Sequence, residues 1–260
     1  MSGSVPRALD AFRLDGCVAL VTGASAGLGA AMAIALAEAG ADVAAHGNSR
    51  APDGTSARVA SVGRRAMSVS GDLGDRAVSG RLVDEVVAGL GRLDILVNNA
   101  GIIRRAPAVE YSDEDWDRVL EIDLTSAFRL ARAAGAHMIG SGRGGRIINV
   151  TSLLAFQGGI TVPAYAAAKG GLAQLTKALA NEWASHGVNV NAIAPGYMET
   201  DNTTALRSDP VRSRQILDRI PAGRWGQPAD LAGAVVFLAS PAARYVHGHV
   251  LAVDGGWLGR

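Results

Sequence analysis

The sequence has little of what marks secreted, membrane-spanning or nucleic-acid-binding proteins. Its 260 residues include one cysteine, Cys17, which cannot form an internal disulfide and lies in an apolar segment typical of a buried strand. Such sparse cysteine use is typical of reducing compartments, so we expect a cytoplasmic protein. The net charge is +1 and no basic run is present, which removes the electrostatic basis for a nucleic-acid partner.

Long apolar runs are missing too. No apolar stretch reaches membrane-spanning length without charges or glycine clusters, and the first residues lack the apolar core of a signal peptide. His247 and His249 have no third ligand at metal-binding spacing, so no metal site is expected. With 48% hydrophobic residues and no internal repeat or linker, the chain can bury one substantial core. We therefore expect a soluble, single-domain protein without a membrane partner.

What the sequence does contain is an alternation of short apolar runs and longer helical segments. Strands are predicted over residues 17–22, 42–46, 66–70, 93–97, 146–150, 188–193 and 249–253. Helices are predicted over residues 27–39, 53–62, 75–90, 112–139, 163–186 and 228–239. This alternation predicts an α/β fold, a single-domain doubly wound parallel sheet (Rossmann-like) with helices on both faces.

Two segments do not fit the alternation. Residues 1–11 are interpreted as a flexible N-terminal lead, which leaves residues 12–260 as the folded domain. Residues 198–219 contain no clear strand, are rich in polar and charged side chains, and follow Pro195-Gly196. Irregular insertions past strand ends are where substrates bind, so we predict a substrate lid with one or two short helices there. A plain surface excursion is the alternative.

The first predicted strand leads into a glycine-rich turn, Gly23-Ala-Ser-Ala-Gly27-Leu-Gly29, and then into an alanine-rich helix. A strand, a glycine turn and a helix together place a pyrophosphate on the helix N-terminus, where free N–H groups and the helix dipole favour anions. Such a turn can be purely structural, but its context favours nucleotide binding. The predicted cofactor contacts in the turn are Gly23, Ser25, Ala26, Gly27, Leu28 and Gly29.

A possible acid/base group lies further along the chain. Tyr165 and Lys169, four residues apart, share one helix face, so the ammonium can lie beside the phenol. A cation there stabilises phenolate and is expected to lower a tyrosine pKa that is ordinarily near 10. Ser152 can hydrogen-bond the substrate oxygen that receives the proton. A tyrosine and a lysine four residues apart are common on helices, so the acid/base interpretation depends on the nucleotide motif.

These motifs, with Asn98-Asn-Ala-Gly101 and Pro195-Gly196, together resemble the short-chain dehydrogenase/reductase family, and the resemblance covers residues 12–260. Further segments resemble its bacterial sugar-acid branch, which contains 2-deoxy-D-gluconate 3-dehydrogenase, 2-dehydro-3-deoxy-D-gluconate 5-dehydrogenase and gluconate 5-dehydrogenase. These segments are Phe156-Gln-Gly-Gly159, Asn181-Glu-Trp183, Ala194-Pro-Gly-Tyr-Met198, Ile220-Pro-Ala-Gly-Arg-Trp-Gly226 and Val253-Asp-Gly-Gly-Trp257.

The resemblance implies one dinucleotide-binding and catalytic domain, a homotetramer, and a role for each matching residue. Tyr165 would be the general acid/base, Lys169 would lower its pKa and touch the nicotinamide ribose, and Ser152 would polarise the substrate carbonyl. The cofactor would carry the hydride. The other implied cofactor contacts are Asp72 and Leu73 near the adenine, Asn99, Ala100 and Gly101 near the ribose, and Pro195, Gly196 and Thr200 near the nicotinamide. Asp72 can alternatively be a strand-end cap.

One position departs from the family pattern. Asp123 lies where the family often has a catalytic asparagine that supports a water relay to the lysine. If the relay uses mainly the backbone carbonyl, Asp123 can still serve as the fourth catalytic residue. Its added charge is expected to raise the pKa of Lys169 and to shift the pH optimum. Neutral drift at this position is the alternative.

The choice between NAD and NADP stays open. An acidic residue after the second strand would bind the ribose 2′-hydroxyl, but the sequence there is Asn48-Ser49-Arg50. Ser49 and Arg50 can cradle a 2′-phosphate, which favours NADP. Against this, Ala26 replaces the basic residue that NADP-preferring relatives often carry in the glycine turn.

A sugar acid needs hydrogen-bond donors for its hydroxyls and a cation for its carboxylate. The predicted substrate contacts are Arg104, Gln157, Tyr197, Asn202 and Arg207, with Arg105 and Thr203 nearby. The leading hypothesis is thus an NAD(P)-dependent oxidoreductase that interconverts a secondary alcohol and a ketone on a gluconate-type sugar acid. The alternatives are a 3-oxoacyl thioester reductase of the same family and a dinucleotide-binding protein without activity.

Overall fold

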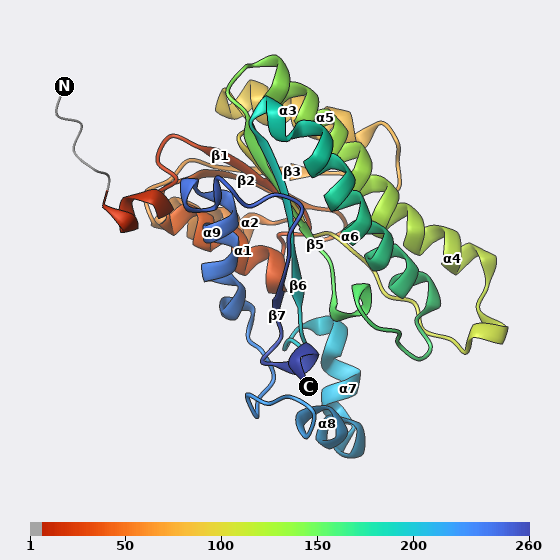
Figure 1. Cartoon of the computed structure of the whole chain (residues 1–260). Helices are drawn as coiled ribbons and strands as arrows, with labels where there is room; N and C mark the ends of the chain where they lie inside the picture. Colours follow the sequence, from red (N-terminus) through yellow and green to blue (C-terminus); the bar gives the residue numbers. More distant parts are fainter. Residues whose placement is uncertain (1–6) are drawn as a thin grey trace.

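The computed structural model describes residues 7–260, and its centre is a sheet of seven parallel strands (Figure 1). The strand order is β3-β2-β1-β4-β5-β6-β7. The strands are β1 (Val18–Val21), β2 (Asp42–Gly47), β3 (Ala66–Ser70), β4 (Ile95–Asn98), β5 (Gly145–Val150), β6 (Val188–Pro195) and β7 (Val250–Val253). Every adjacent pair is parallel, which confirms the predicted doubly wound α/β fold and the seven predicted strands to within two residues at each end.

Nine α-helices occur among the described residues. They are α1 (Gly27–Glu38), α2 (Asp53–Ser61), α3 (Val78–Leu90), α4 (Asp113–Leu120), α5 (Ser126–Gly140), α6 (Pro163–Trp183), α7 (Thr204–Ser208), α8 (Pro210–Leu217) and α9 (Ala232–Ala239). The six predicted helices are all present. The predicted helix over 112–139 is a composite, because a π-helical segment, Glu121–Thr125, separates α4 from α5.

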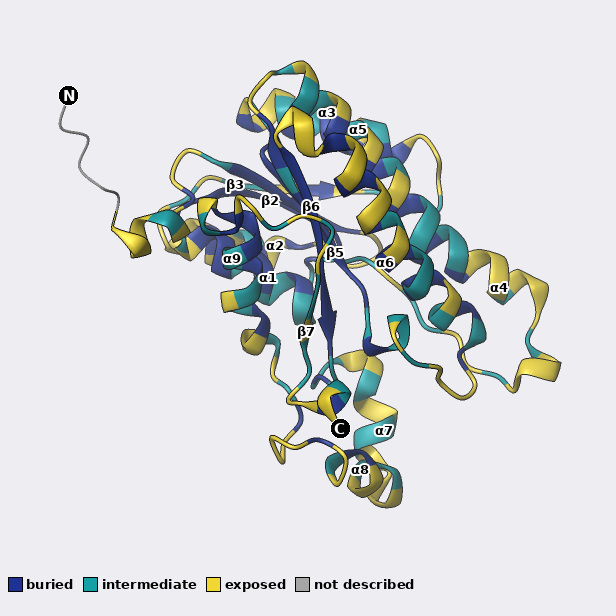
Figure 2. Cartoon of the chain, viewed as in Figure 1, coloured by how far each residue is buried: buried dark blue, intermediate teal, exposed yellow. Residues whose placement is uncertain are grey.

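Helices cover both faces of the sheet, and the five inner strands lie buried between them, whereas the edge strands β3 and β7 are partly exposed (Figure 2). Along β1, Ala19 and Val21 pack with α1, α2 and α9, whereas Val18 and Leu20 pack with α3, α5 and α6. This alternation follows from the two-residue period of a strand. Because both faces are apolar, the strands read as continuous hydrophobic runs, and this property made them predictable.

The strand order reverses between β1 and β4, because the chain returns from the edge strand β3 to form β4 on the other side of β1. β1 pairs with β2 on one side and with β4 on the other, so the connections at their carboxyl ends diverge. In open parallel sheets a crevice forms at such a switch point, and ligands bind there. The loops after β1, β4, β5 and β6 all begin at this edge.

The segment over 198–219 extends beyond this edge as a separate small cluster. It contains a 3₁₀ turn, Asp201–Thr203, followed by α7 and α8, which lie beside the C-terminus in Figure 1. Two short helices therefore occur where one or two were expected. At the other end of the chain, part of the predicted lead, residues 1–6, lies outside the described residues. Ala8–Phe12 form a 3₁₀ helix, and the Phe12 ring lies 6.3 Å from the Phe237 ring.

Candidate active site

One cavity of about 670 Å³ opens at the carboxyl edge of the sheet. Its volume falls within the range of small-molecule and cofactor sites. It connects the glycine turn after β1 with the loops after β4, β5 and β6 and with the 198–219 segment. The predicted site residues in its lining are Gly23, Ala26, Gly27, Leu28, Gly29, Asn99, Ala100, Gly101, Ser152, Gln157, Tyr165, Lys169, Pro195, Gly196, Tyr197, Thr200 and Asn202.

The glycine turn presents backbone rather than side chains to this cavity. Gly23 and Gly27 have φ angles of 63° and 56°, a left-handed conformation that favours glycine. A Cβ on Gly29 would lie 2.3 Å from the Gly23 carbonyl oxygen, so no side chain fits where α1 meets the turn. α1 begins without a side-chain cap at Ala26 and without an acidic residue in its first turn. Its first N–H groups are therefore available for an anion such as a pyrophosphate.

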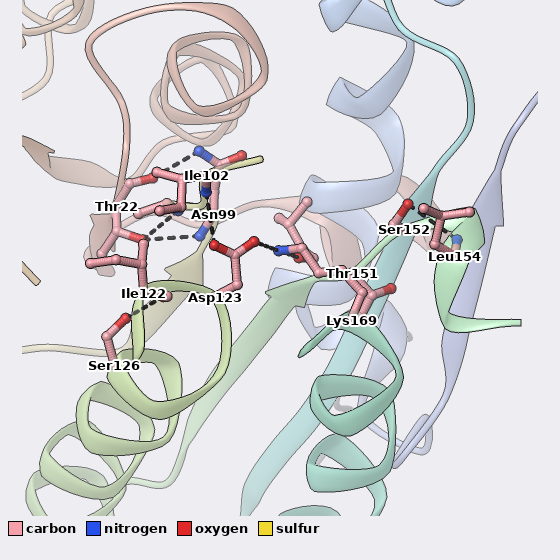
Figure 3. Close-up of polar contacts among 12 residues, drawn as sticks. Thr22, Asn99, Ile102, Ile122, Asp123, Ser126, Thr151, Ser152, Leu154 and Lys169 are labelled. Atoms are coloured by element: carbon pink, nitrogen blue, oxygen red, sulfur yellow. Dashed lines mark hydrogen bonds and ion pairs between the residues drawn. The ribbon is translucent and has the colours of Figure 1, made fainter. Parts of the chain in front are cut away.

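A hydrogen-bond network fixes the turn against the loop after β4 (Figure 3). The Thr22 hydroxyl accepts from the backbone N–H groups of Asn99 and Ala100 at 2.9 and 3.0 Å. The Asn99 side-chain amide donates in return to the Thr22 carbonyl oxygen at 2.9 Å. Thr22 was not among the predicted site residues, because its role is to hold two loops together. On the other side of the turn, the Ser25 hydroxyl donates to the Arg50 carbonyl oxygen at 2.6 Å.

The three residues of the predicted catalytic set come from two neighbouring elements. Ser152 follows β5, and its hydroxyl accepts from the Leu154 N–H at 3.2 Å. Tyr165 and Lys169 lie one turn apart on α6, with the Lys169 ammonium 5.4 Å from the centre of the Tyr165 ring. The ammonium also donates to the Val150 carbonyl oxygen at 3.1 Å, which ties α6 to the end of β5. All three side chains line the cavity, as predicted.

The Asp123 carboxylate lies beside the Lys169 ammonium (Figure 3). Its Oδ2 is 3.3 Å from the Lys169 ammonium, and its Oδ1 accepts from the Ile102 N–H at 2.8 Å. Both side chains are buried, with Asp123 1% and Lys169 4% exposed. The π-helical turn over Glu121–Thr125 carries Asp123 to this position, and such turns are frequent at functional sites. Asp123 therefore contacts the catalytic set through a buried ion pair.

This ion pair changes the pKa values of the site. Desolvation alone lowers the pKa of the Lys169 ammonium, but the Asp123 carboxylate and the Tyr165 phenolate outweigh it and hold the pKa above its ordinary value. This confirms the expected direction for Lys169. For the Asp123 carboxyl, burial has the opposite effect: it raises the pKa, and this outweighs the lowering by Lys169 and by the hydrogen bond from the Ile102 N–H.

Tyr165 differs from the expectation. Burial raises the pKa of its phenol above the ordinary value; Lys169 lowers it, Asp123 raises it further, and the Ser152 hydroxyl lowers it. The expectation that the lysine leaves the net pKa lowered is wrong for this geometry, since lost hydration and the aspartate outweigh the ammonium. The lysine acts in the expected direction, but the Asp123 carboxylate opposes its effect on the phenol.

Several predicted contacts lie outside the lining of the cavity. Arg104 forms an ion pair with Asp115 at 3.3 Å, and Arg207 lies 3.9 Å from Glu199. Asp72 accepts from the Gly74 N–H at 2.9 Å, as a cap does, and from Arg118, which holds the pKa of its carboxyl below the ordinary value. The other predicted contacts outside the lining are Ser25, Asn48, Ser49, Arg50 and Leu73. Asn48, Ser49 and Arg50 follow β2, on the nucleotide side of the switch point.

The cavity also exposes residues that the sequence analysis did not select. Among them are Thr161, Asp201, Arg212, Arg219 and Trp257. Arg105, which the sequence places beside Arg104 as a candidate cation for the substrate carboxylate, lines the cavity as well. Arg212 lies on α8, whereas Arg219 lies in the turn that follows this helix, so no helical spacing indicated that the two arginines line one cavity. Thr161 has a φ of 62°, the only left-handed non-glycine residue among the described ones, so the cavity wall holds local strain.

Two kinds of feature are absent from residues 7–260. No group of three or more histidine, cysteine, aspartate or glutamate side chains is arranged to hold a metal ion. No helix combines the length and apolar character needed to cross a membrane.

Comparisons with known proteins agree with this geometry. A family model described as enoyl-(acyl carrier protein) reductase matches residues 23–258. The 2-dehydro-3-deoxy-D-gluconate 5-dehydrogenase of Escherichia coli is 54% identical over 254 residues, which cover 97% of this chain and 99% of that protein.

Solved structures give the same result. A putative 2-deoxy-D-gluconate 3-dehydrogenase from Agrobacterium tumefaciens with bound NADP superposes with a TM-score of 0.91 at 53% identity, covering 96% of this chain and 99% of that one. A gluconate 5-dehydrogenase from Burkholderia cenocepacia in complex with NADP and tartrate gives a TM-score of 0.92 at 40% identity, with 98% and 100% coverage.

Proposed function

The chain belongs to the short-chain dehydrogenase/reductase family of NAD(P)-dependent oxidoreductases, and we propose that it interconverts a secondary alcohol and a ketone on a sugar acid. The substrate class is that of gluconate, deoxygluconate or keto-deoxygluconate, which is also that of the relatives' names. The observation that carries the proposal is the single cavity in which Ser152, Tyr165 and Lys169 meet both the glycine turn and the side chains of three arginines, Arg105, Arg212 and Arg219.

The residues present fit a dinucleotide. The uncapped start of α1 suits the pyrophosphate, the loop after β4 suits a ribose, and Pro195, Gly196 and Thr200 suit the nicotinamide side of the same cavity. When bound, the nicotinamide supplies or accepts the hydride. We assign Asp72 and Leu73 to the adenine side, where the Asp72 carboxylate keeps an acceptor although it also binds Arg118.

Proton transfer falls to Tyr165. In reduction its hydroxyl gives a proton to the carbonyl oxygen of the substrate, and in oxidation its phenolate takes the proton from the substrate hydroxyl. The Ser152 hydroxyl donates a hydrogen bond to the same oxygen and so holds it near the tyrosine. Lys169 stabilises the phenolate by its charge, and Asp123 together with the Val150 carbonyl fixes the lysine in place.

The substrate side of the cavity is built from the lid that we assign to residues 198–219. Gln157, Tyr197 and Asn202 supply hydrogen-bonding groups for hydroxyls, and arginine supplies a cation for the carboxylate. Closing the lid would exclude water from the reacting centre. Arg104 and Arg207 already have carboxylate neighbours, so they are less suited to the substrate carboxylate than the arginines in the lining.

We further propose that NADP is the preferred cofactor. Arg50 is exposed after β2, no carboxylate lies among Asn48, Ser49 and Arg50, and two solved relatives contain NADP. An arginine binds a 2′-phosphate through charge-assisted hydrogen bonds that NAD does not offer. Ala26 in the glycine turn supplies no second cation.

The competing enzyme function is reduction of a 3-oxoacyl thioester, the activity in the name of a relative from Vibrio cholerae that is 44% identical over 247 residues. That substrate needs an apolar channel for its acyl chain. Arg212, Arg219 and Asn202 in the lining favour the sugar acid instead. A binding protein without activity is disfavoured because Ser152, Tyr165 and Lys169 share one cavity.

The test is to measure NADH and NADPH absorbance change with gluconate, 2-deoxygluconate, 5-ketogluconate and 2,5-diketo-3-deoxygluconate, and with an acetoacetyl thioester. Turnover of a sugar acid, faster with NADP(H), is the expected result. Activity on the thioester alone would replace the proposal by the competing one. Cofactor binding without turnover of any of these compounds would point to the binding protein.

We also propose that the protein is a cytoplasmic homotetramer. α6 carries small residues on its open side: Ala167 is exposed, and a Cβ on Gly170 would touch nothing within 4 Å. Two helices with such faces can approach closely. Light scattering coupled to gel filtration should give four times the 26.6 kDa chain mass, and Gly170→Leu should lower it. A monomeric wild type would contradict this assignment.

A further inference from the structure

We propose that Arg219 binds the carboxylate of the substrate and that Trp257 holds it in position. The inference rests on the proposed function, because it names the group that recognises the acid end of a sugar acid. Both residues line the cavity that contains Ser152 and Tyr165, although they lie 38 residues apart in the chain. Neither was selected from the sequence as a substrate contact.

Among the cations in the lining, Arg219 has no carboxylate partner among the described residues, and its guanidinium is positioned by the Trp257 ring. Among the described residues its guanidinium makes no ion pair or hydrogen bond, so all its donors are available. Arg212 already donates to Gln215 at 3.2 Å. Arg105 is also unpaired, but no aromatic ring or acceptor positions its side chain, and its charge acts on the Tyr165 phenol instead.

The Trp257 indole forms the platform for this arginine. The guanidinium carbon of Arg219 lies 4.0 Å from the centre of the indole ring, within the range of a cation–π contact. A guanidinium stacked by its face keeps its edge N–H groups free, and that edge matches a carboxylate with two parallel hydrogen bonds. A side chain held before the ligand arrives loses less conformational entropy on binding.

The platform itself is rigid. Trp257 is 4% exposed and packs with Leu153, Ile216, Ile220 and Trp225. Its indole N–H donates to the Gln157 side-chain oxygen at 3.2 Å. The Tyr197 ring lies 4.7 Å from it.

This cluster links recognition to chemistry. Leu153 follows the catalytic Ser152 directly in the chain, whereas Ile216 and Ile220 flank Arg219 on the lid side. The same apolar cluster therefore positions both Arg219 and Ser152. A carboxylate bound by Arg219 would place the rest of a short sugar chain toward Ser152 and Tyr165.

The test uses binding and kinetics of the full-length enzyme with NADP. Calorimetric titration of gluconate and of tartrate into the NADPH complex, in which no oxidised nicotinamide can accept a hydride, measures carboxylate binding without turnover. We expect Arg219→Gln to raise the dissociation constant of both anions and the KM of the sugar acid by about 10- to 100-fold, the range for a lost charge-assisted contact. The value of kcat and the affinity for NADP should change little.

Three other variants sharpen the test. Arg219→Lys keeps the charge but not the bidentate edge, so it should recover part of the lost affinity. Trp257→Phe keeps an aromatic ring but removes the hydrogen bond to Gln157, and it should raise KM less than Arg219→Gln does while kcat is retained. Arg214→Gln is the matched control, because this exposed arginine of α8 is paired with Asp218 at 3.0 Å outside the lining and its loss should leave KM unchanged.

The contrary outcomes are distinct. Anion binding and KM unaffected by Arg219→Gln, or a rise produced by Arg105→Gln or Arg212→Gln instead, would overturn the inference. A wild-type enzyme that binds gluconate through Arg219 but turns over no sugar acid would overturn the proposed function alone. A wild-type NADPH complex that binds neither gluconate nor tartrate would overturn the inference as well.

Discussion

The two walls of the cavity recognise ligands in different ways. The wall around the glycine turn uses backbone: no side chain fits at Gly29, and the uncapped start of α1 offers its N–H groups. The wall around residues 198–219 uses long side chains on two short helices and the turn after them, among them Arg212 and Arg219. The backbone wall suits the pyrophosphate, which all dinucleotides share. The side-chain wall can be adapted to another substrate by substitution of its side chains.

The largest expected effect comes from the residue between the two walls. Tyr165→Phe should reduce turnover by about 10²- to 10⁴-fold, since general acid/base catalysis contributes that much. It should leave both walls intact, so NADP and gluconate should bind as in the wild type. Rate measurements combined with calorimetry of both ligands check this. Substantial turnover in the variant would remove Tyr165 from the catalytic role.

The next largest effect should come from the backbone wall. In Gly29→Ala the added Cβ would meet the Gly23 carbonyl oxygen at 2.3 Å and the Asn99 side-chain amide at 2.5 Å. We expect a loss of about 1–3 kcal/mol in the free energy of unfolding and at least about a tenfold weaker binding of NADP. Denaturant unfolding and fluorescence titration measure the two effects.

The control for this variant is Gly80→Ala within α3. A Cβ there would touch nothing within 4 Å, and alanine in a helix interior is favoured over glycine by about 1 kcal/mol. The control should therefore be slightly more stable and bind NADP normally. If Gly29→Ala behaves like Gly80→Ala, or if Arg219→Gln weakens NADP binding as much as Gly29→Ala, the contrast between the two walls is not real.

A smaller effect is expected at the edge of the backbone wall. Arg50 is the side chain there that distinguishes cofactors in our proposal, so Arg50→Ala should raise the KM for NADPH by about tenfold and leave that for NADH nearly unchanged. Arg58→Ala, an exposed arginine in the last turn of α2, is the control. Equal changes for the two cofactors would show that Arg50 does not contact the 2′-phosphate.

The smallest effect on the maximal rate is expected from Asp123→Asn, which should instead move the pH profile. The Asp123 carboxylate raises the pKa values of both Lys169 and Tyr165, and Lys169, Ser152 and Arg105 are the groups that lower the pKa of Tyr165. Removing the carboxylate therefore lowers the pKa of the phenol, so oxidation should reach half-maximal rate at a lower pH. The asparagine oxygen can still accept from Ile102, which protects the fold.

Rates of oxidation and reduction across pH check this direction. In reduction, which needs the protonated phenol, the falling limb should move to lower pH as well. An optimum that Asp123→Asn leaves unmoved would show that the aspartate is neutral in function.

The two walls also differ in how far they were predictable. Gly23, Gly27 and Gly29 are required by local backbone geometry, and Tyr165 and Lys169 by helical spacing, so both features can be read from a few consecutive residues. The net pKa of Tyr165 depends on burial and on Asp123, which lies 42 residues away in the chain, and it was predicted in the wrong direction.

Arginines were the least predictable residues. Arg104 and Arg207 lie in segments that flank the chemistry, yet their carboxylate neighbours Asp115 and Glu199 draw them away from the cavity lining. The partner of a long, flexible arginine side chain depends on which carboxylates and rings the tertiary structure brings near it. Arg219 gained its position from Trp257, which is 38 residues away, and no local pattern indicates that contact.

The π-helical turn between α4 and α5 has a consequence for the register of the whole helical pair. The Ser126 N–H donates to the Glu121 carbonyl oxygen, five residues back, so the turn holds one residue more than an α-helix would. Removing one residue from Glu121–Thr125 would restore regular winding and rotate everything on one side by about 100° relative to the other. Asp123 and the faces that α4 and α5 present to their neighbours would then fall out of phase. The extra residue thus sets the rotation of α5 relative to α4. It allows one continuous helical segment to pack against two sets of neighbours and to bury the Asp123 carboxylate.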